Sequence, residues 1–207
     1  MSAKALLISV LAAGAVAAQA QVVFSNISAS YTLNPGPSTF AWQTFPDSTA
    51  GIIDFVSTAD PFKVGAGTGY STGTSTVSYS VTSTLPITSI TMVLQGSVFH
   101  SGGVNYMTTV SDNVGSLGSV SGLIQGSDFG GVDGAFTLPL TINFSRAVTS
   151  FDVQNMFAID INGNSLPSES IASIGLIEQN MRTTVPEPAS LAAIGLGLAA
   201  FLRKRRA

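Results

Sequence analysis

Apolar side chains alternate with Ser, Thr and Asn at a period of two through much of the middle of the chain. The clearest stretch is Phe136–Phe144, in which Phe, Leu and Ile occupy every second position, and Thr76–Thr82 repeats the pattern. A strand with one face in a core and the other in water produces this alternation. No stretch between residues 21 and 184 shows a convincing amphipathic helical period. The pattern therefore predicts an all-β body.

Clusters of Gly, Pro, Asn and Asp separate these stretches, as hairpins and loops require. Roughly eight to ten short strands of this kind favour a single β-sandwich domain of jelly-roll type over residues 21–184. A body of this length can bury a core of its own. The further candidate strands are Val22–Thr32, Thr39–Thr44, Gly51–Thr58, Ile90–Phe99, Asn105–Val110, Ser150–Ile161 and Ile171–Gln179.

The N-terminus has the three parts of an export signal. Lys4 supplies a positive charge, an apolar run extends from Ala5 to Ala18, and Ala18 and Ala20 form a small-residue cleavage site around Gln19. We therefore predict a signal peptide over residues 1–20. Signal peptidase is expected to remove it.

The C-terminus has a different order of parts, over residues 185–207. Pro186, Glu187 and Pro188 precede the uncharged run Ala189–Leu202, and the basic tail follows. A helix over this run is about 21 Å long, against a hydrocarbon core of roughly 30 Å. We predict a short transmembrane helix whose basic residues reach the lipid headgroups and stay cytoplasmic, so that the body faces away from the cytoplasm. The tail consists of Arg203, Lys204, Arg205 and Arg206.

The order Pro-Glu-Pro, short apolar helix and basic end, in a chain with a signal peptide, resembles that of PEP-CTERM sorting-domain proteins. The resemblance implies export across the inner membrane of a Gram-negative bacterium, transient anchoring there with the body in the periplasm, and processing by an exosortase. It also implies a place at the cell surface or outside the cell, and a structural or adhesive role linked to exopolysaccharide or biofilm. Pro186, Glu187 and Pro188 would then be a recognition motif for another enzyme. The central domain is assigned to no family by these residues.

Charge and cysteine content exclude several classes of protein. Only 9% of the residues are charged, and residues 21–184 carry three Lys and Arg against ten Asp and Glu, a net charge of about −7. Such a body lacks the positive face that nucleic acids need. The chain has no cysteine, so disulfides, thiol nucleophiles and cysteine metal sites are excluded.

One motif suggests hydrolysis, but its context argues against it. Gly69–Gly73 matches the G-x-S-x-G pattern of a nucleophile elbow, which joins a strand to a helix. Here a predicted strand follows, and no Asp or Glu lies between Ser71 and His100, which is the single histidine. We expect His100 to be a strand-end or loop residue. A secreted hydrolase is the least favoured function, and we predict that the chain is not an enzyme.

Calcium is the one cofactor that the sequence leaves open. Asp160 and Asn162 begin a segment with oxygen ligands at alternate positions, and Asp128 and Asp133 lie in a Gly-rich loop. The EF-hand pattern fails, because Gly163 falls two positions early and Ile171 occupies the position of the bidentate glutamate. An Asn-Gly turn between two strands is the favoured interpretation of the first segment.

A carbohydrate-binding module is the main alternative function, and calcium could assist its binding. Trp42, with Phe40 and Phe45 nearby, could form a platform on which sugar rings stack, although core packing is the favoured role for these aromatic side chains. Asp152 and Asp160 could share one face of a strand. Eight residues span about 26 Å there, too far for a catalytic carboxylate pair.

Overall fold

The computed structural model of the chain describes residues 21–36, 38–57, 61–161 and 169–183. Within these ranges, no helix is long and apolar enough to cross a membrane. Several predictions concern residues outside them: the signal peptide with Ala18 and Ala20, the calcium candidate Asn162, the motif Pro186, Glu187 and Pro188, and the tail Arg203, Lys204, Arg205 and Arg206.

The described part of the chain is built of antiparallel strands, and its one helical segment is a short 3₁₀ turn, η1 (Ser127–Phe129). The prediction of an all-β body is confirmed. The strands are β1 (Val22–Asn34), β2 (Ser38–Ala41), β3 (Gln43–Asp47), β4 (Ile52–Val56), β5 (Phe62–Gly65), β6 (Thr72–Phe99), β7 (Gly102–Asp112), β8 (Gly115–Gln125), β9 (Gly134–Ile161) and β10 (Ile171–Thr183).

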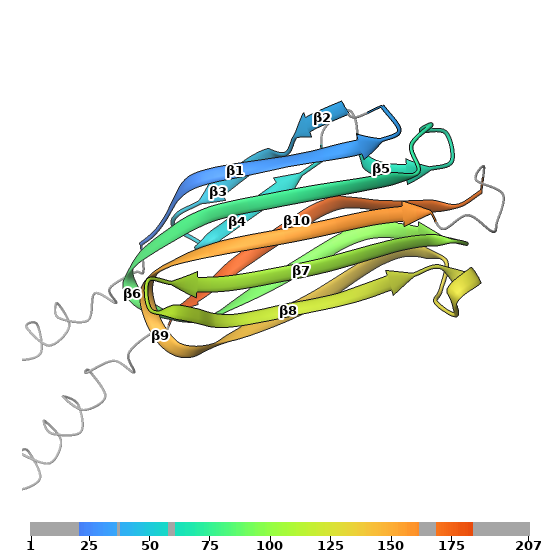
Figure 1. The fold of residues 1–207 in the computed structure, drawn as a ribbon. Coiled ribbons are helices and arrows are strands. Elements are labelled where there is room, and N and C mark those ends of the chain that lie inside the picture. Colours follow the sequence, from blue (N-terminus) through green and yellow to red (C-terminus); the bar gives the residue numbers. More distant parts are fainter. Residues whose placement is uncertain (1–20, 37, 58–60, 162–168, 184–207) are drawn as a thin grey trace, which may run out of the picture. The chain divides into compact units, whose positions relative to one another are not determined.

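The two longest strands, β6 and β9, each have 28 residues and run through both layers of the structure (Figure 1). The ladder between them is interrupted between Thr82 and Ile87 and again before Ser89, where both strands turn over. The first half of β6 pairs with β1, whereas its second half pairs with β10. One continuous hydrogen-bonded sheet thereby folds into two packed layers, as the predicted sandwich requires.

We call the two layers front and back, as they lie in Figure 1. The front layer has the order β2-β1-β6-β9-β7-β8, formed with the first half of β6 and the second half of β9. The back layer has the order β3-β4-β10-β6-β9, with β5 beside β4 on the same edge of β10. Alternate side chains of both layers point into the space between them.

Trp42 belongs to the core. Its side chain is 5% exposed, its indole N–H donates to Ser75 Oγ at 2.9 Å, and its ring packs edge-on against Tyr31 and Phe62. The favoured interpretation of Trp42 as a packing residue is confirmed. The alternative role of Trp42, as a platform on which sugar rings stack, is wrong, because the buried ring presents no face to solvent.

A buried polar cluster joins the two layers near the centre of the sandwich. Asn155 Oδ1 accepts hydrogen bonds from Thr108 Oγ1 at 2.8 Å and from Gln179 Nε2 at 2.9 Å, and the Tyr79 hydroxyl donates to Gln179 Oε1 at 2.6 Å. Tyr79 and Gln179 come from opposite layers. Since burial without partners is costly for polar groups, these bonds favour one alignment of the layers over its alternatives.

Two carboxylates lie directly opposite each other on the outer face of the back layer. Asp54 of β4 pairs in register with Glu178 of β10, and one Asp54 oxygen is buried without a hydrogen-bond partner among the described residues. Burial, and second the charge of Glu178, raise the pKa of the Asp54 carboxyl. This pair costs stability at neutral pH.

Asp54→Asn is therefore expected to raise the free energy of unfolding at pH 7 by about 0.5 kcal/mol, the usual size of a solvent-screened cross-strand charge effect. A carboxyl whose pKa is higher in the folded state destabilises at high pH, and the penalty disappears as the pH falls through that pKa. The gain should thus vanish below about pH 4. Urea unfolding at both pH values measures it. Glu178→Gln should give a similar gain, and additive gains in the double variant would contradict a pairwise repulsion.

Candidate functional site

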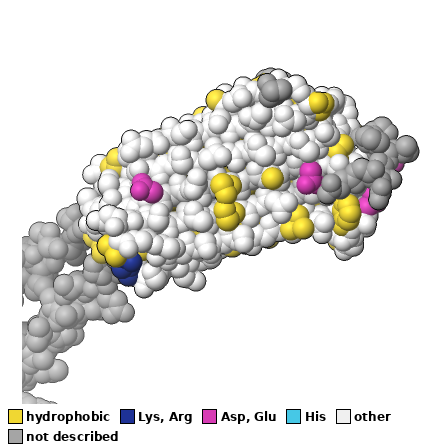
Figure 2. Space-filling view, in the orientation of Figure 1, with side chains coloured by type: hydrophobic (Ala, Val, Ile, Leu, Met, Phe, Trp, Pro, Cys, Tyr) yellow, Lys and Arg dark blue, Asp and Glu magenta, His cyan; other side chains and the backbone are white. Residues whose placement is uncertain are grey.

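A groove crosses the outer face of the front layer. It has a volume of about 590 Å³ and runs over four adjacent strands, β6, β9, β7 and β8. In Figure 2 apolar side chains gather in the middle of this face, with acidic side chains on either side along its length. The lining side chains that point outward are Thr74, Thr76, Asn105, Met107, Ser121, Leu123, Met156 and Ala158. Among the residues that the structure describes, none that is charged lines the groove.

The floor of the groove is apolar because the register brings two methionines together. Met107 of β7 lies directly opposite Met156 of β9, and both occupy outward positions of their strands. Their exposed fractions are 38% and 39%, and Leu123 on β8 is 51% exposed. These three residues are not among the site residues predicted from the sequence. The available signal was an apolar side chain at a position where the alternation calls for a polar one.

A second, smaller hollow of about 280 Å³ lies on the same face. Ser78, Ser80, Thr109, Ser111 and Gln154 surround it together with Asp152. Ser80 Oγ donates to Asp152 Oδ1 at 2.6 Å, and Asn26 Nδ2 donates to Ser80 Oγ at 3.2 Å. Asn26 has a positive φ of 53° and lies where the pairing of β1 with β6 slips, between Ser25 and Ser28. The face is thus covered with hydroxyl and amide groups.

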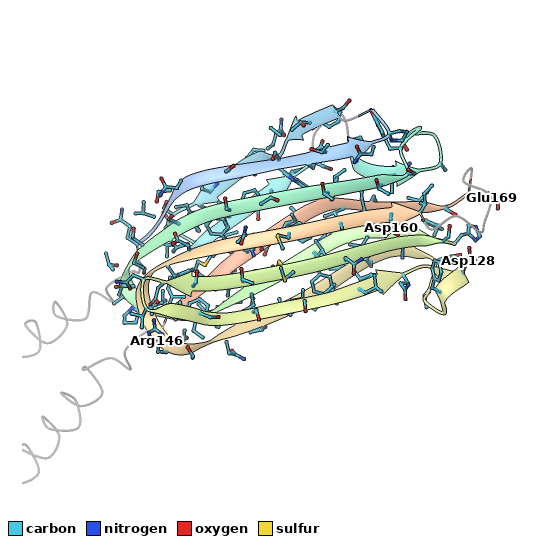
Figure 3. The ribbon with its side chains drawn as sticks, in the orientation of Figure 1. Asp128, Arg146, Asp160 and Glu169 are labelled. Carbon is cyan, nitrogen blue, oxygen red and sulfur yellow. The ribbon has the colours of Figure 1, made fainter. Side chains whose placement is uncertain are left out.

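Asp152 and Asp160 occupy outward positions on either side of Met156 on β9, at equal distances along the strand. The prediction that they share a face without forming a pair agrees with this placement. Burial raises the pKa of the Asp160 carboxyl. Asp128, Asp160 and Glu169 lie toward one end of the sandwich, and Arg146 lies at the other (Figure 3).

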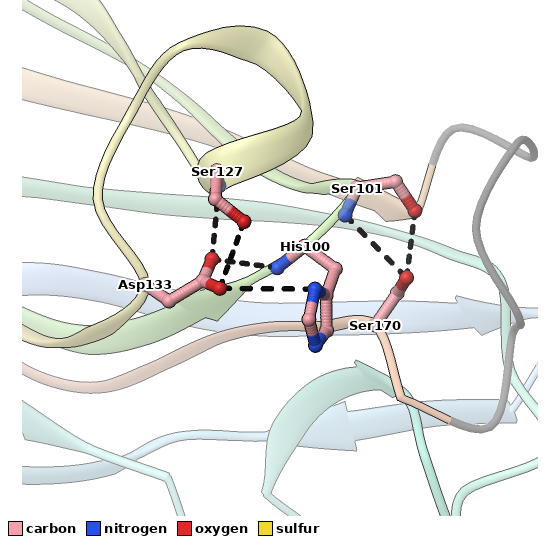
Figure 4. Close-up of polar contacts among 5 residues, drawn as sticks. All are labelled: His100, Ser101, Ser127, Asp133 and Ser170. Atoms are coloured by element: carbon pink, nitrogen blue, oxygen red, sulfur yellow. Dashed lines mark hydrogen bonds and ion pairs between the residues drawn. The ribbon is translucent and has the colours of Figure 1, made fainter.

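His100, in the turn between β6 and β7, and Asp133, in the loop between β8 and β9, come together (Figure 4). Asp133 Oδ1 accepts hydrogen bonds from the backbone N–H groups of His100 at 2.7 Å and Ser127 at 2.9 Å, and Oδ2 accepts from Ser127 Oγ at 2.8 Å. The N–H of Ser127 is the largest cause that holds the pKa of Asp133 below its usual range. His100 has a φ of 51° in the turn between β6 and β7, so it is a loop residue, as expected.

The calcium candidates lie in different surroundings. Asp128 and Asp133 belong to the loop between β8 and β9, whereas Asp160 lies near the end of β9. Both oxygens of Asp133 already accept hydrogen bonds from protein groups. Across the described ranges, no group of three or more His, Cys, Asp or Glu side chains is arranged to hold a metal ion. This arrangement gives calcium binding no support from geometry.

The G-x-S-x-G segment leads into a strand. β6 begins at Thr72, directly after Ser71, and the Ser71 N–H donates to the Asn34 carbonyl at 2.8 Å. A nucleophile elbow needs a helix after the serine, so that its N-terminus can stabilise the oxyanion. Ser71 therefore lacks the backbone setting of that motif.

Among known protein families, a match is found for the C-terminal segment and none for the body. Residues 184–206 match the PEP-CTERM protein-sorting motif, as the sequence predicts, and the motif identifies an exported, exosortase-sorted surface protein. No curated protein sequence matches the chain.

Several solved structures share a general resemblance with the body. One is TmCBM61 in complex with β-1,4-galactotriose, with 10% identity, a TM-score of 0.33, and coverage of 80% of this chain and 90% of that one. The xylan-binding module CBM15 has 13% identity, a TM-score of 0.34, and coverage of 78% and 97%. A module of Cellvibrio mixtus lichenase 5A in complex with cellotriose has 12% identity, a TM-score of 0.26, and coverage of 76% and 88%. At these TM-scores the binding properties of those proteins do not transfer to this chain.

Proposed function

We propose that this protein has a structural or adhesive role at the cell surface or in the extracellular matrix of a Gram-negative bacterium, in contact with exopolysaccharide. The observation that carries the proposal is the sorting motif at residues 184–206, because it assigns the chain to exosortase processing. According to this proposal, the chain is anchored in the inner membrane only transiently. Signal peptidase and the exosortase are its processing enzymes.

The outer face of the front layer supports a contact with an uncharged polymer. Its groove combines hydroxyl and amide groups with the methyl and methylene groups of Met107, Met156 and Leu123. Sugar rings present the same two kinds of surface, hydroxyl edges and apolar C–H faces. Asp152 and Asp160 on either side of the groove repel acidic polymers. We therefore propose a neutral stretch of exopolysaccharide as the partner.

A carbohydrate-binding module with a defined sugar site fits the groove less well. Such sites rely on exposed aromatic rings, whereas the aromatic residues in the lining are Tyr106, which is half-buried, and Phe157, which is buried. We propose a broad, weak contact repeated over many molecules, without catalysis and without a required cofactor.

Intact mass spectrometry of membrane and secreted fractions tests the sorting. In a host with an active exosortase, we expect a species that begins at Gln21 and ends close to Pro186–Pro188. In a strain that lacks the exosortase, that species should disappear, and a membrane-bound form that keeps Arg203–Arg206 should accumulate. A chain that keeps this tail in both strains would overturn the proposal.

A further inference from the structure

A sandwich has free strand edges, and most of those in this protein are protected against pairing with other molecules. β2 has four residues, and β3 contains Pro46 and Asp47. The first half of β9, which forms one edge of the back layer, contains Pro139. Short strands, charges and prolines are the usual means of preventing edge-to-edge association. Each of these edges therefore carries at least one protective feature.

The edge strand β8 lacks all of these features. It has 11 residues with neither charge nor proline. Within the described ranges it pairs with β7 along one edge and with no strand along the other. Its outward side chains include Ser119, Ser121 and Leu123, which are exposed. A row of backbone N–H and C=O groups is thus available to another strand.

The sequence of β8 identifies which strand fits this edge. Residues 117–123 have the sequence Leu-Gly-Ser-Val-Ser-Gly-Leu, which is the same in both directions. When two copies of β8 lie antiparallel around a two-fold axis at Val120, identical residue types face each other: Val120 meets Val120, and Ser119 meets Ser121. Isologous pairing of this kind needs a self-complementary patch, which a palindromic strand provides.

Two glycines on the inner face of β8 pack closely against neighbouring residues. Gly118 packs against β9, where an added Cβ would lie 2.8 Å from Ile142 Cγ2, and Gly122 packs against Tyr106. The two glycines face each other across the axis. Serine hydroxyls occupy the outward positions, and opposed Ser or Thr side chains hydrogen-bond across strands.

We propose that two copies of this chain associate antiparallel along β8, with the two-fold axis at Val120, and so join their front layers into one sheet. The partner is a second copy because the palindrome matches β8 to itself. The two groove-bearing faces then lie side by side. This association goes beyond the proposed function and requires neither polysaccharide nor exosortase.

Cysteine cross-linking of the full chain in its host tests the axis, since the natural sequence has no cysteine. Opposed Cα atoms in an antiparallel pair lie about 4.5–5.5 Å apart, within the range of a disulfide. Val120→Cys should therefore form a covalent dimer at least tenfold faster than Val114→Cys under mild oxidation. Val114 is 76% exposed, so it controls for random collision. Equal rates for the two variants would overturn the proposal.

A charge exchange on the exposed serines tests the register in the Val120→Cys background. The variant S119K/S121K places like charges opposite each other twice, so its cross-linking should fall to the rate of Val114→Cys. The variant S119K/S121E places opposite charges together at the same two points, so its cross-linking should persist. Loss in both variants, or in neither, would contradict the register. The sorting experiment reads chain ends only, so its outcome is independent of this one.

Discussion

Asn155→Ala is expected to lower the free energy of unfolding of the β-sandwich by about 3 kcal/mol. Asn155 is fully buried, and its side-chain oxygen accepts from both Thr108 and Gln179. Its removal leaves these two donors with Met92 Sδ as an acceptor, at 3.6 and 3.5 Å, and sulfur is a weak acceptor. A cavity between the layers adds to the loss. Equilibrium urea unfolding measures the change.

Two further variants separate hydrogen bonding from packing at this position. Thr108→Val removes one donor and should cost about 1 kcal/mol in the natural background, and less when Asn155 is already Ala, because the two side chains are coupled. Asn155→Asp keeps the acceptor but places a carboxyl in the core. Since burial raises the pKa of that carboxyl in the folded state, the variant should lose stability as the pH rises and recover it in acid. A cost below about 0.5 kcal/mol for Asn155→Ala would contradict the cluster's role.

The sequence predicts the class of the fold because alternation with period two is a local property. The stretches around Val77 and Leu140 lie in strands as expected, and the sandwich follows from their number and their turns. The full lengths of the two long strands could not be predicted from this alternation. β6 and β9 are each predicted as two separate strands, because the bends near residues 83–88 and 144–149 interrupt the alternation as a loop does.

Two strands were missed for different local reasons. β5 has four residues and lies beside a Gly-rich turn, and β8 contains three glycines that break its pattern. Glycine has a low strand propensity, so its presence favours a loop unless tertiary packing requires it. At Gly118 and Gly122 packing does require it, because neighbouring atoms occupy the space of a side chain.

The groove could not be predicted, because it depends on pairing between residues far apart in the chain. Met107 and Met156 meet only in the register of β7 with β9, and Leu123 joins them through β8. An apolar side chain on the wet face of a predicted strand is ordinary when it stands alone. Three together on one sheet form an apolar patch, and this patch is where we propose that the polysaccharide lies.

Met156→Lys is expected to weaken binding to the host's purified exopolysaccharide about tenfold, equivalent to about 1.4 kcal/mol. Met156 lies midway between Asp152 and Asp160 along β9, and a lysine there replaces the apolar floor with a charge that a neutral sugar does not balance. Affinity electrophoresis in gels that contain the polysaccharide measures the change.

The matched control is Thr141→Lys, which adds the same charge at an exposed position of the same strand, on the outer face of the back layer. Thr141→Lys should bind as the natural protein does if the front face makes the contact. Binding of the natural protein should also change little with salt, since no ion pairs are involved, and alginate, an acidic polymer, should bind poorly. Equal weakening by both substitutions, or stronger binding to alginate than to the host polymer, would show that charge and not the groove governs the contact.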